Sequence, residues 1–294
     1  MTLTELSTAD SAPGPASFRR GVVAFWHTYN QDWRAVLGLY LMLVAVLVAL
    51  FAPYLAPFNP NAMSDHLLRP PSGAYWMGTD HLGRDIFSRV VWGARISLLF
   101  AVGAAAISLS IGVVMGAIPG YFGGIIDQIF SRFFEFFLII PMLFLVILMA
   151  SLLGANIYVA AFVVGITIWP SNARIVRAQV LSLKKRAFVR AARATGASHM
   201  RILFRHILMN GIQPVVVNST LQVGSAILIE ASLSFLGLGD PNLASWGQML
   251  REAQSYLTTQ WWFALFPGLA IGWLVLGSTL MGDGINRALN AAER

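Results

Sequence analysis

Six apolar stretches, separated by polar segments, lie along the chain at 35–56, 96–119, 133–153, 155–173, 211–236 and 262–282. Each is long enough, or nearly so, to cross about 30 Å of hydrocarbon as an α-helix. Many secondary transporters contain an internal repeat that relates one half of the chain to the other. No such repeat is visible in this sequence. The pattern predicts an all-α integral membrane protein with about six transmembrane helices.

The composition supports a membrane location. The 294 residues are 57% hydrophobic and only 11% charged, against about 25% charged residues in ordinary soluble domains. A soluble fold needs more polar cover than this chain supplies, so part of its apolar surface must face lipid. Because there is no cysteine, disulfides and thiolate metal sites are excluded.

The polar N-terminal region divides into two parts. Residues 1–17 are small and polar and lack the apolar core of a signal peptide, so we expect a disordered cytoplasmic tail. Residues 18–34 place apolar side chains at helical spacing between arginines, and these side chains are Val22, Phe25, Trp26, Tyr29 and Trp33. This spacing predicts an amphipathic helix along the inner leaflet. The alternative is an N-terminal extension of the first span, 35–56.

Basic residues set the orientation. With the N-terminus in the cytoplasm, fifteen of the 20 Lys and Arg side chains lie inside and five lie outside, as the positive-inside rule requires. Residues 57–95 then form an extracytoplasmic loop, and 96–285 form the main transmembrane domain. The segment 180–210 and a tail at 286–294 are cytoplasmic, so both termini lie inside.

Several catalytic classes are excluded by missing motifs. The only lysines, Lys184 and Lys185, do not follow a glycine, so a phosphate-binding G-x-x-x-x-G-K-[ST] loop is impossible. There is no G-x-S-x-G nucleophile elbow and no H-E-x-x-H pair. His66 and His81 lie near Asp65, Asp80 and Asp85, where a weak metal site is conceivable, but solvated loop residues are the favoured interpretation. We therefore expect no catalytic residue and no metal.

The cytoplasmic segment 180–210 is the most informative loop. Residues 181–195 favour a helix, Gly196 can stop it in the left-handed conformation, and Ser198 can cap a second helix. A small-residue face suits insertion into a partner's groove, and its members are Ala187, Ala191, Ala192 and Ala194. The alternative is an amphipathic surface loop whose arginines only satisfy the positive-inside rule.

The stretch Arg190-Ala191-Ala192-Arg193-Ala194-Thr195-Gly196, followed by Ile207-Leu208, resembles the EAA motif of ABC importer permeases. In that family this motif forms the coupling loop, which docks on the ATPase subunit. The residues that this resemblance assigns to docking are Phe188, Val189, Arg190, Ala191, Ala192, Arg193, Gly196 and Ala197. The chain departs from the pattern at Arg190, where the family has glutamate, and at Met209, where it has proline.

Two further stretches, 78–89 (GTDHLGRDIFSR) and 232–239 (SLSFLGLG), resemble the dipeptide and oligopeptide permeases, as do Trp246-Gly247 and 282–284 (GDG). The similarity covers about 33–290 and is closest to the second, C-type membrane subunit. From the residues alone, Thr79 or Asp80 can cap a short outer helix, and Gly237 and Gly239 end the fifth span.

The resemblance implies a type I ABC importer transmembrane fold in a bacterial or archaeal cytoplasmic membrane. It also implies a sister permease subunit, two ABC ATPase subunits that use the ATP, and an extracytoplasmic substrate-binding protein. This chain would be a non-catalytic pore subunit that binds no cofactor and no nucleic acid. Di- and oligopeptides are the expected cargo, with nickel or another small solute as the alternative. A self-contained secondary transporter and an intramembrane enzyme are less favoured readings.

The fifth span carries the polar side chains expected to line a translocation path, which are Gln213, Asn218, Gln222 and Glu230. Their spacing keeps them roughly on one side of the helix, and polar groups in a bilayer face a bundle interior or a water-filled path. The alternative is hydrogen bonding between helices. Pro141 and Pro170 are expected to bend the third and fourth spans.

Overall fold

The computed structural model describes residues 15–153 and 156–292, and within these ranges it is helical and contains no β-strand beyond one isolated bridge. The long helices are α1 (Pro15–Gln31), α2 (Trp33–Leu50), α4 (Ile86–Phe122), α5 (Gly124–Ile139), α6 (Met142–Leu153), α7 (Ile157–Leu183), α11 (Gln213–Phe235) and α13 (Trp261–Ala292). The short elements are α3 (Ala52–Leu55), α8 (Ala187–Ala194), α9 (His199–Arg201), the π-helix η1 (Ile202–Leu208), α10 (Met209–Gly211), α12 (Trp246–Ala253) and the 3₁₀-helix η2 (Gln254–Tyr256).

Five of the described helices, α2, α4, α7, α11 and α13, are each long and apolar enough to cross a membrane. The pair α5 and α6 supplies a sixth apolar segment, bent by 80°. Pro141 lies in the break, where Ile140 has extended backbone angles, because a residue before proline is pushed out of the helical region. The expected bend at Pro141 is confirmed, whereas Pro170 lies within the continuous helix α7.

Several helices extend beyond the apolar stretches that predicted them. Helix α4 begins at Ile86, so residues 86–95 are helical and do not belong to the outer loop. Its N-cap is Asp85, whose Oδ2 accepts a hydrogen bond from the backbone N–H of Ser88 at 2.8 Å, so the cap predicted at Thr79 or Asp80 is wrong. Helix α13 runs through Ala292, and residues 286–292 are therefore helix rather than a tail.

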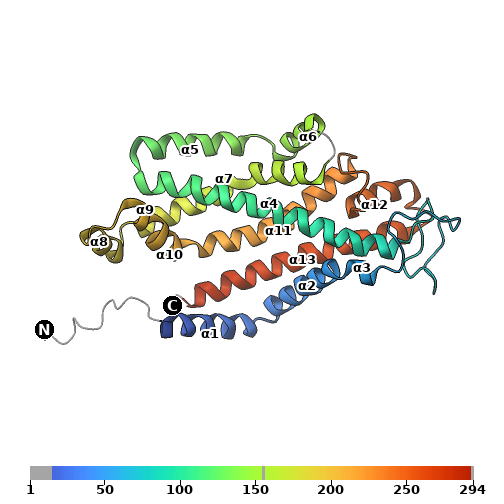
Figure 1. Cartoon of the computed structure of the whole chain (residues 1–294), viewed down its shortest axis with the longest axis horizontal. Helices are drawn as coiled ribbons and strands as arrows, with labels where there is room; N and C mark the ends of the chain where they lie inside the picture. Colours follow the sequence, from blue (N-terminus) through green and yellow to red (C-terminus); the bar gives the residue numbers. More distant parts are fainter. Residues whose placement is uncertain (1–14, 154–155, 293–294) are drawn as a thin grey trace.

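The N-terminal helix α1 begins at Pro15, so only residues 1–14 of the expected tail lie outside the described residues. Asp32 separates α1 from α2 and caps α2. Tyr29 is buried against Ala35 and Ala288, and Asp32 pairs with Arg287 at 2.8 Å. Figure 1 shows α1 beside the end of α13 and roughly along the direction of the long helices. This arrangement agrees better with an extension of the first span than with a helix lying flat on the leaflet.

Small residues allow α4 and α7 to pack closely. Gly112, Gly116 and Gly120 repeat every four residues on α4 and face α7, and a side chain at Gly116 would collide with the backbone of Ala173. Such small-x-x-x-small spacing is typical of helix contacts in membranes.

The two ends of the bundle are distinct. Figure 1 shows α1, the C-terminus and α8–α10 at one end, and the loop 56–85 and α12 at the other. The charge pattern predicts this same division, and we call these the inner end and the outer end.

Candidate functional site

The coupling loop (180–210) starts within α7 and folds at the inner end as α8, a glycine turn, α9 and η1. Gly196 has φ of +79°. The N–H of Ala197 donates to the carbonyl of Ala192 at 3.1 Å, and the N–H of Gly196 donates to the carbonyl of Arg193 at 3.1 Å. This pair of bonds is a Schellman motif, which requires a left-handed residue at Gly196. Ser198 Oγ then accepts the N–H of Arg201 at 3.4 Å, so both predicted stop and start signals are confirmed.

One face of the coupling loop is fixed to the bundle. Val189, Ile202, Leu203 and Ile207 are at most 1% exposed, and they form an apolar cluster with side chains of α4 and α7, which are Ala117, Tyr121, Val176 and Val180. Val189 was expected at the docking surface, and its burial in this cluster corrects that expectation. The cluster therefore packs the loop directly against two membrane-spanning helices.

Two polar contacts also join the coupling loop to the inner end of α4. The hydroxyl of Tyr121 lies 2.9 Å from Nδ1 of His199, and Lys184 Nζ donates to the carbonyl of Gly120 at 2.9 Å. The segment η1 is a π-helix of seven residues, a form that is rare and is frequently found at functional sites.

The other face of the coupling loop is exposed and basic. Arg190, Ala191, Arg193, Ala194 and Gly196 are all exposed, whereas Phe188, Ala192 and Ala197 are half-buried. The loop holds seven Lys and Arg side chains and no Asp or Glu. Within the described ranges, the ion pairs that form do not include any of these seven cations. Three of the four alanines of the small-residue face, Ala187, Ala191 and Ala194, are therefore exposed beside these cations, whereas Ala192 packs against the apolar cluster.

The polar side chains of the fifth span have two different surroundings. Gln222 is 8% exposed and its Oε1 accepts hydrogen bonds from Ser108 Oγ at 2.9 Å and from Asn172 Nδ2 at 3.0 Å. Asn218, which is half-buried, donates to Asn172 Oδ1 at 2.8 Å. This polar cluster joins α4, α7 and α11.

Glu230 lies closer to the outer end and is 4% exposed. Its carboxylate accepts hydrogen bonds from Ser234 Oγ at 2.8 Å and from Ser97 Oγ at 3.3 Å. Gln222 and Glu230 therefore make hydrogen bonds between helices, which was the alternative to lining a path. Among the four predicted path residues, Gln213 is exposed and Asn218 is partly accessible.

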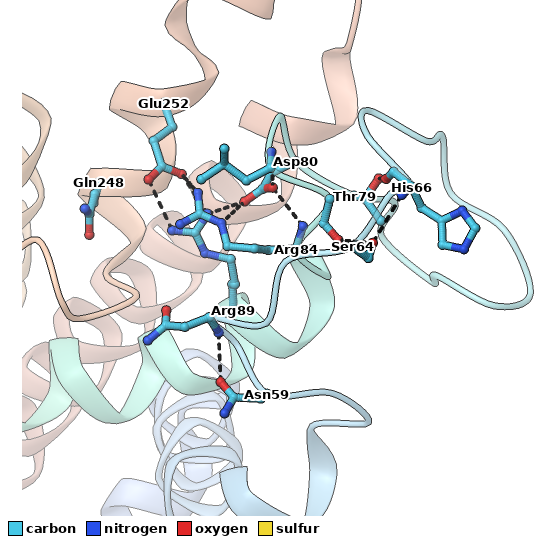
Figure 2. A network of polar contacts seen from close by, with 12 residues as sticks. Asn59, Ser64, His66, Thr79, Asp80, Arg84, Arg89, Gln248 and Glu252 are labelled. Atoms are coloured by element: carbon cyan, nitrogen blue, oxygen red, sulfur yellow. Dashed lines mark hydrogen bonds and ion pairs between the residues drawn. The ribbon is translucent and has the colours of Figure 1, made fainter.

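The outer end contains a buried ionic cluster, the outer cluster, made of Asp80, Arg84, Arg89 and Glu252. Figure 2 shows the two guanidinium groups between the two carboxylates. Arg89 Nη1 lies 2.5 Å from Asp80 Oδ2 and 2.7 Å from Glu252 Oε2, and Arg84 Nε lies 2.6 Å from Asp80 Oδ2. Arg84 Nη2 adds a contact of 2.7 Å to Glu252 Oε2. The cluster ties the outer loop and the start of α4 to α12.

The outer cluster argues against a metal site built on Asp80 and His81, which are two of the residues that the sequence left as conceivable ligands. Ligand atoms of Asp80, His81 and Glu252 lie within 4.8 Å of one another. Both carboxylates, however, already bind two guanidinium groups, and a metal cation there would be repelled by the same positive charges.

The sequence did not predict which residues meet in these clusters. No local pattern links Glu252 to Arg84 and Arg89, which lie 168 and 163 residues away along the chain. Asn172 stood within the predicted fourth span as an unexplained polar residue and was the available signal for the polar cluster. Asp127, which holds Arg177 of α7 at 2.5 and 2.7 Å, was likewise not anticipated.

Comparisons with known proteins match almost the whole chain. Residues 108–294 match the family described as "Binding-protein-dependent transport system inner membrane component". Residues 23–71 match the "N-terminal TM domain of oligopeptide transport permease C".

Among individual relatives, the dipeptide transport system permease protein DppC of Alkalihalophilus pseudofirmus is 40% identical over 262 residues, covering 87% of this chain and 85% of the relative. The oligopeptide transport system permease protein OppC of Bacillus subtilis is 41% identical over 270 residues, covering 90% of this chain and 88% of the relative. A solved structure of the MetNI methionine ABC transporter in inward-facing conformations has a TM-score of 0.55 at 21% identity, covering 70% of this chain and 97% of its own. That likeness establishes the fold.

Proposed function

Since the chain belongs to the family of binding-protein-dependent transport system inner membrane components and to its dipeptide and oligopeptide permease C subunits, we propose that it helps to import di- and oligopeptides across a bacterial cytoplasmic membrane. Members of this family are non-catalytic permease subunits of ABC transporters, and separate subunits hydrolyse the ATP. The chain is a multi-pass integral membrane protein.

The observation that carries this proposal is the two-faced coupling loop. Its inner face is fixed to α4 and α7 through Val189 and Ile202, and its outer face presents exposed Arg190 and Arg193 beside small alanines. A rigid element with bare cations and a small-residue surface fits a groove with acidic groups or backbone carbonyls on an ATPase subunit. Closure of the ATPase pair would push this loop, and the apolar cluster would pass the movement to the membrane helices.

The remaining partners follow from the same assignment. We propose a sister permease subunit, two ABC ATPase subunits and an extracytoplasmic binding protein that delivers the cargo at the outer end. The translocation path would then lie between the two permeases. Gln213 and Asn218 remain candidates for its surface, while Gln222 and Glu230 hold the bundle together.

Purification and uptake test this proposal. The tagged chain, extracted from native membranes in mild detergent, should bring with it a second permease and an ATPase that carries a phosphate-binding loop. Vesicles containing that complex and the binding protein should accumulate labelled dipeptides when ATP is supplied. Uptake of nickel without uptake of peptides would identify nickel as the cargo. Uptake by the chain alone, driven by an ion gradient, would indicate a secondary transporter.

The absence of cysteine allows a direct test of orientation in the same cells. Cysteines placed at Ser72 and Gln254, which are exposed at the outer end, should react with an impermeant thiol reagent. A cysteine at Ser182, exposed at the inner end, should stay unlabelled until the membrane is opened. Labelling of a cysteine at Ser182 in sealed cells would show that the orientation is the reverse of the one proposed.

A further inference from the structure

An apolar cavity of about 320 Å³ lies at the outer half of the bundle between α2, α4 and α13, beneath Met77 of the outer loop. Its wall includes Val48 of α2, Val90 and Ala94 of α4, and Ala270 of α13. An engineered cavity of about 150 Å³ is enough to bind benzene. A space of this size is therefore large enough for a ligand.

The chemistry of the wall defines the ligand. All of the lining side chains are apolar or tryptophan, and both indole N–H groups are already used. Trp246 Nε1 donates to the carbonyl of Val90 at 2.9 Å, and Trp273 Nε1 donates to the carbonyl of Leu41 at 3.0 Å. Ordered water needs two to four polar partners, and an ion or a peptide needs polar contacts as well. The cavity suits only a hydrocarbon.

The cavity opens on the exposed surface of a helix that is apolar enough to cross a membrane. Leu269 and Trp273 line it, and their side chains are 59% and 43% exposed on the membrane-spanning helix α13. An unfilled hole at this place leaves its walls without dispersion contacts on one side, whereas the surrounding bilayer supplies hydrocarbon chains that can enter.

The chemistry of the wall favours a lipid tail over a protein segment. A partner segment other than a complete helix would bring backbone N–H and C=O groups to a wall that offers them no hydrogen-bond partner, which costs free energy. A flexible acyl chain carries no polar group along its length and can follow an irregular space. We propose that this cavity binds one acyl chain of a membrane phospholipid and that the chain completes the packing of α2 against α4 and α13.

Photo-crosslinking of a lipid tests the proposal. The full-length protein, with the subunits that accompany it, is placed in vesicles of phosphatidylethanolamine and phosphatidylglycerol that contain a trace of phosphatidylethanolamine with a diazirine in one acyl chain. After irradiation, mass spectrometry maps the labelled residues. Val90 and Ala94 of α4 should be labelled about fivefold more than Leu99, which is exposed on the same helix; this ratio corresponds to ~1 kcal/mol.

Two filling variants and a matched control separate a bound tail from general lipid contact. Ala270→Phe and Ala45→Leu each occupy part of the cavity and should lower labelling of Val90 and Ala94 about fivefold. Leu276→Phe enlarges an exposed residue of α13 outside the cavity and should leave that labelling unchanged.

Either of two results would overturn the proposal. One is equal or weaker labelling of Val90 and Ala94 relative to Leu99 in the wild-type protein, which would show that lipid only coats the surface. The other is a crosslink from a photoreactive residue at position 270 to an accompanying subunit in place of lipid, which would assign the cavity to a protein side chain. The wild-type ratio decides the question even if a filling variant fails to fold.

Discussion

The outer cluster and the coupling loop differ in how their charges are neutralised. At the outer end, Asp80 is 0% and Arg89 1% exposed, and two cations meet two anions within one chain. At the inner end, the coupling loop carries seven cations and no acid, and Arg190 and Arg193 are exposed. Charge that is neutralised inside the chain holds the fold, whereas charge left exposed is available to a partner.

The largest effect should come from opening the outer cluster. Arg89→Leu leaves the buried carboxylate of Asp80 and the half-buried carboxylate of Glu252 with less positive charge, and removal of one partner from a buried ion pair costs about 3–5 kcal/mol. We expect a lower midpoint of thermal unfolding for the purified protein in detergent. The control is Arg95→Leu, an exposed arginine of the same helix that stacks on Trp92. Its cost should be no more than about 1 kcal/mol.

Equal destabilisation by the two leucine variants would show that the outer cluster contributes little to the fold. Arg89→Lys offers a finer comparison, because it keeps the charge and loses the forked hydrogen bonds. The midpoint of thermal unfolding of Arg89→Lys should lie between those of the wild type and Arg89→Leu.

The contrast between the ends also explains what the sequence could predict. The coupling loop depends on local signals: a left-handed glycine at Gly196 and a cap at Ser198 act within a few residues of themselves. The outer cluster depends on a meeting between Arg89 and Glu252, 163 residues apart. The hydropathy pattern also placed the start of α4 too late, because Arg89 and Arg95 lower the hydropathy of residues 86–95. Only the fold shows that the charge of Arg89 is paired.

The same distinction applies within the membrane. Polarity alone marked Gln222 and Glu230 as candidates for a path, since spacing on one helix does not reveal the neighbouring helices. Their partners, Ser108 and Asn172 for Gln222 and Ser97 for Glu230, come from other spans. The apolar pattern predicted the number of spans, because bilayer thickness fixes the length of each one, but it carried no information on which polar groups meet.

An intermediate effect is expected at the turn that shapes the inner end. Gly196 has φ of +79° and open space around the position of a Cβ atom, so a substitution there meets backbone strain and no steric clash. For an L-residue this conformation costs roughly 1–2 kcal/mol, and a β-branched residue tolerates it least. Gly196→Val should lower the yield of complex with the ATPase and lower transport.

Gly196→Asn is the matched control, because asparagine enters the left-handed region more readily than other residues. A yield of complex that decreases from glycine to asparagine to valine at position 196 would show that the conformation of the turn matters for docking. A normal complex and normal transport in Gly196→Val would mean that docking does not require this turn, and the coupling loop would lose its role as a rigid element.

The smallest effect, and the sharpest test of the comparison, concerns Arg190, where the family pattern has glutamate. Arg190 is exposed, and an exposed ion pair is worth about 0–1 kcal/mol, rising to about 3–5 kcal/mol if the partner's groove buries the pair. Arg190→Ala should weaken assembly with the ATPase slightly and Arg190→Glu more. High salt should narrow the difference, since screening acts on exposed charges.

Arg205→Glu supplies the control for this measurement, because it makes the same charge change at another exposed arginine of the coupling loop. If Arg190→Glu weakens assembly more than Arg205→Glu, position 190 touches the ATPase, and its arginine requires an acidic group or carbonyls opposite it. If both reversals act equally, the loop attracts its partner by net charge alone. If assembly is unchanged in every variant, Arg190 faces water, and the exposed charge of the inner end serves orientation in the membrane rather than binding.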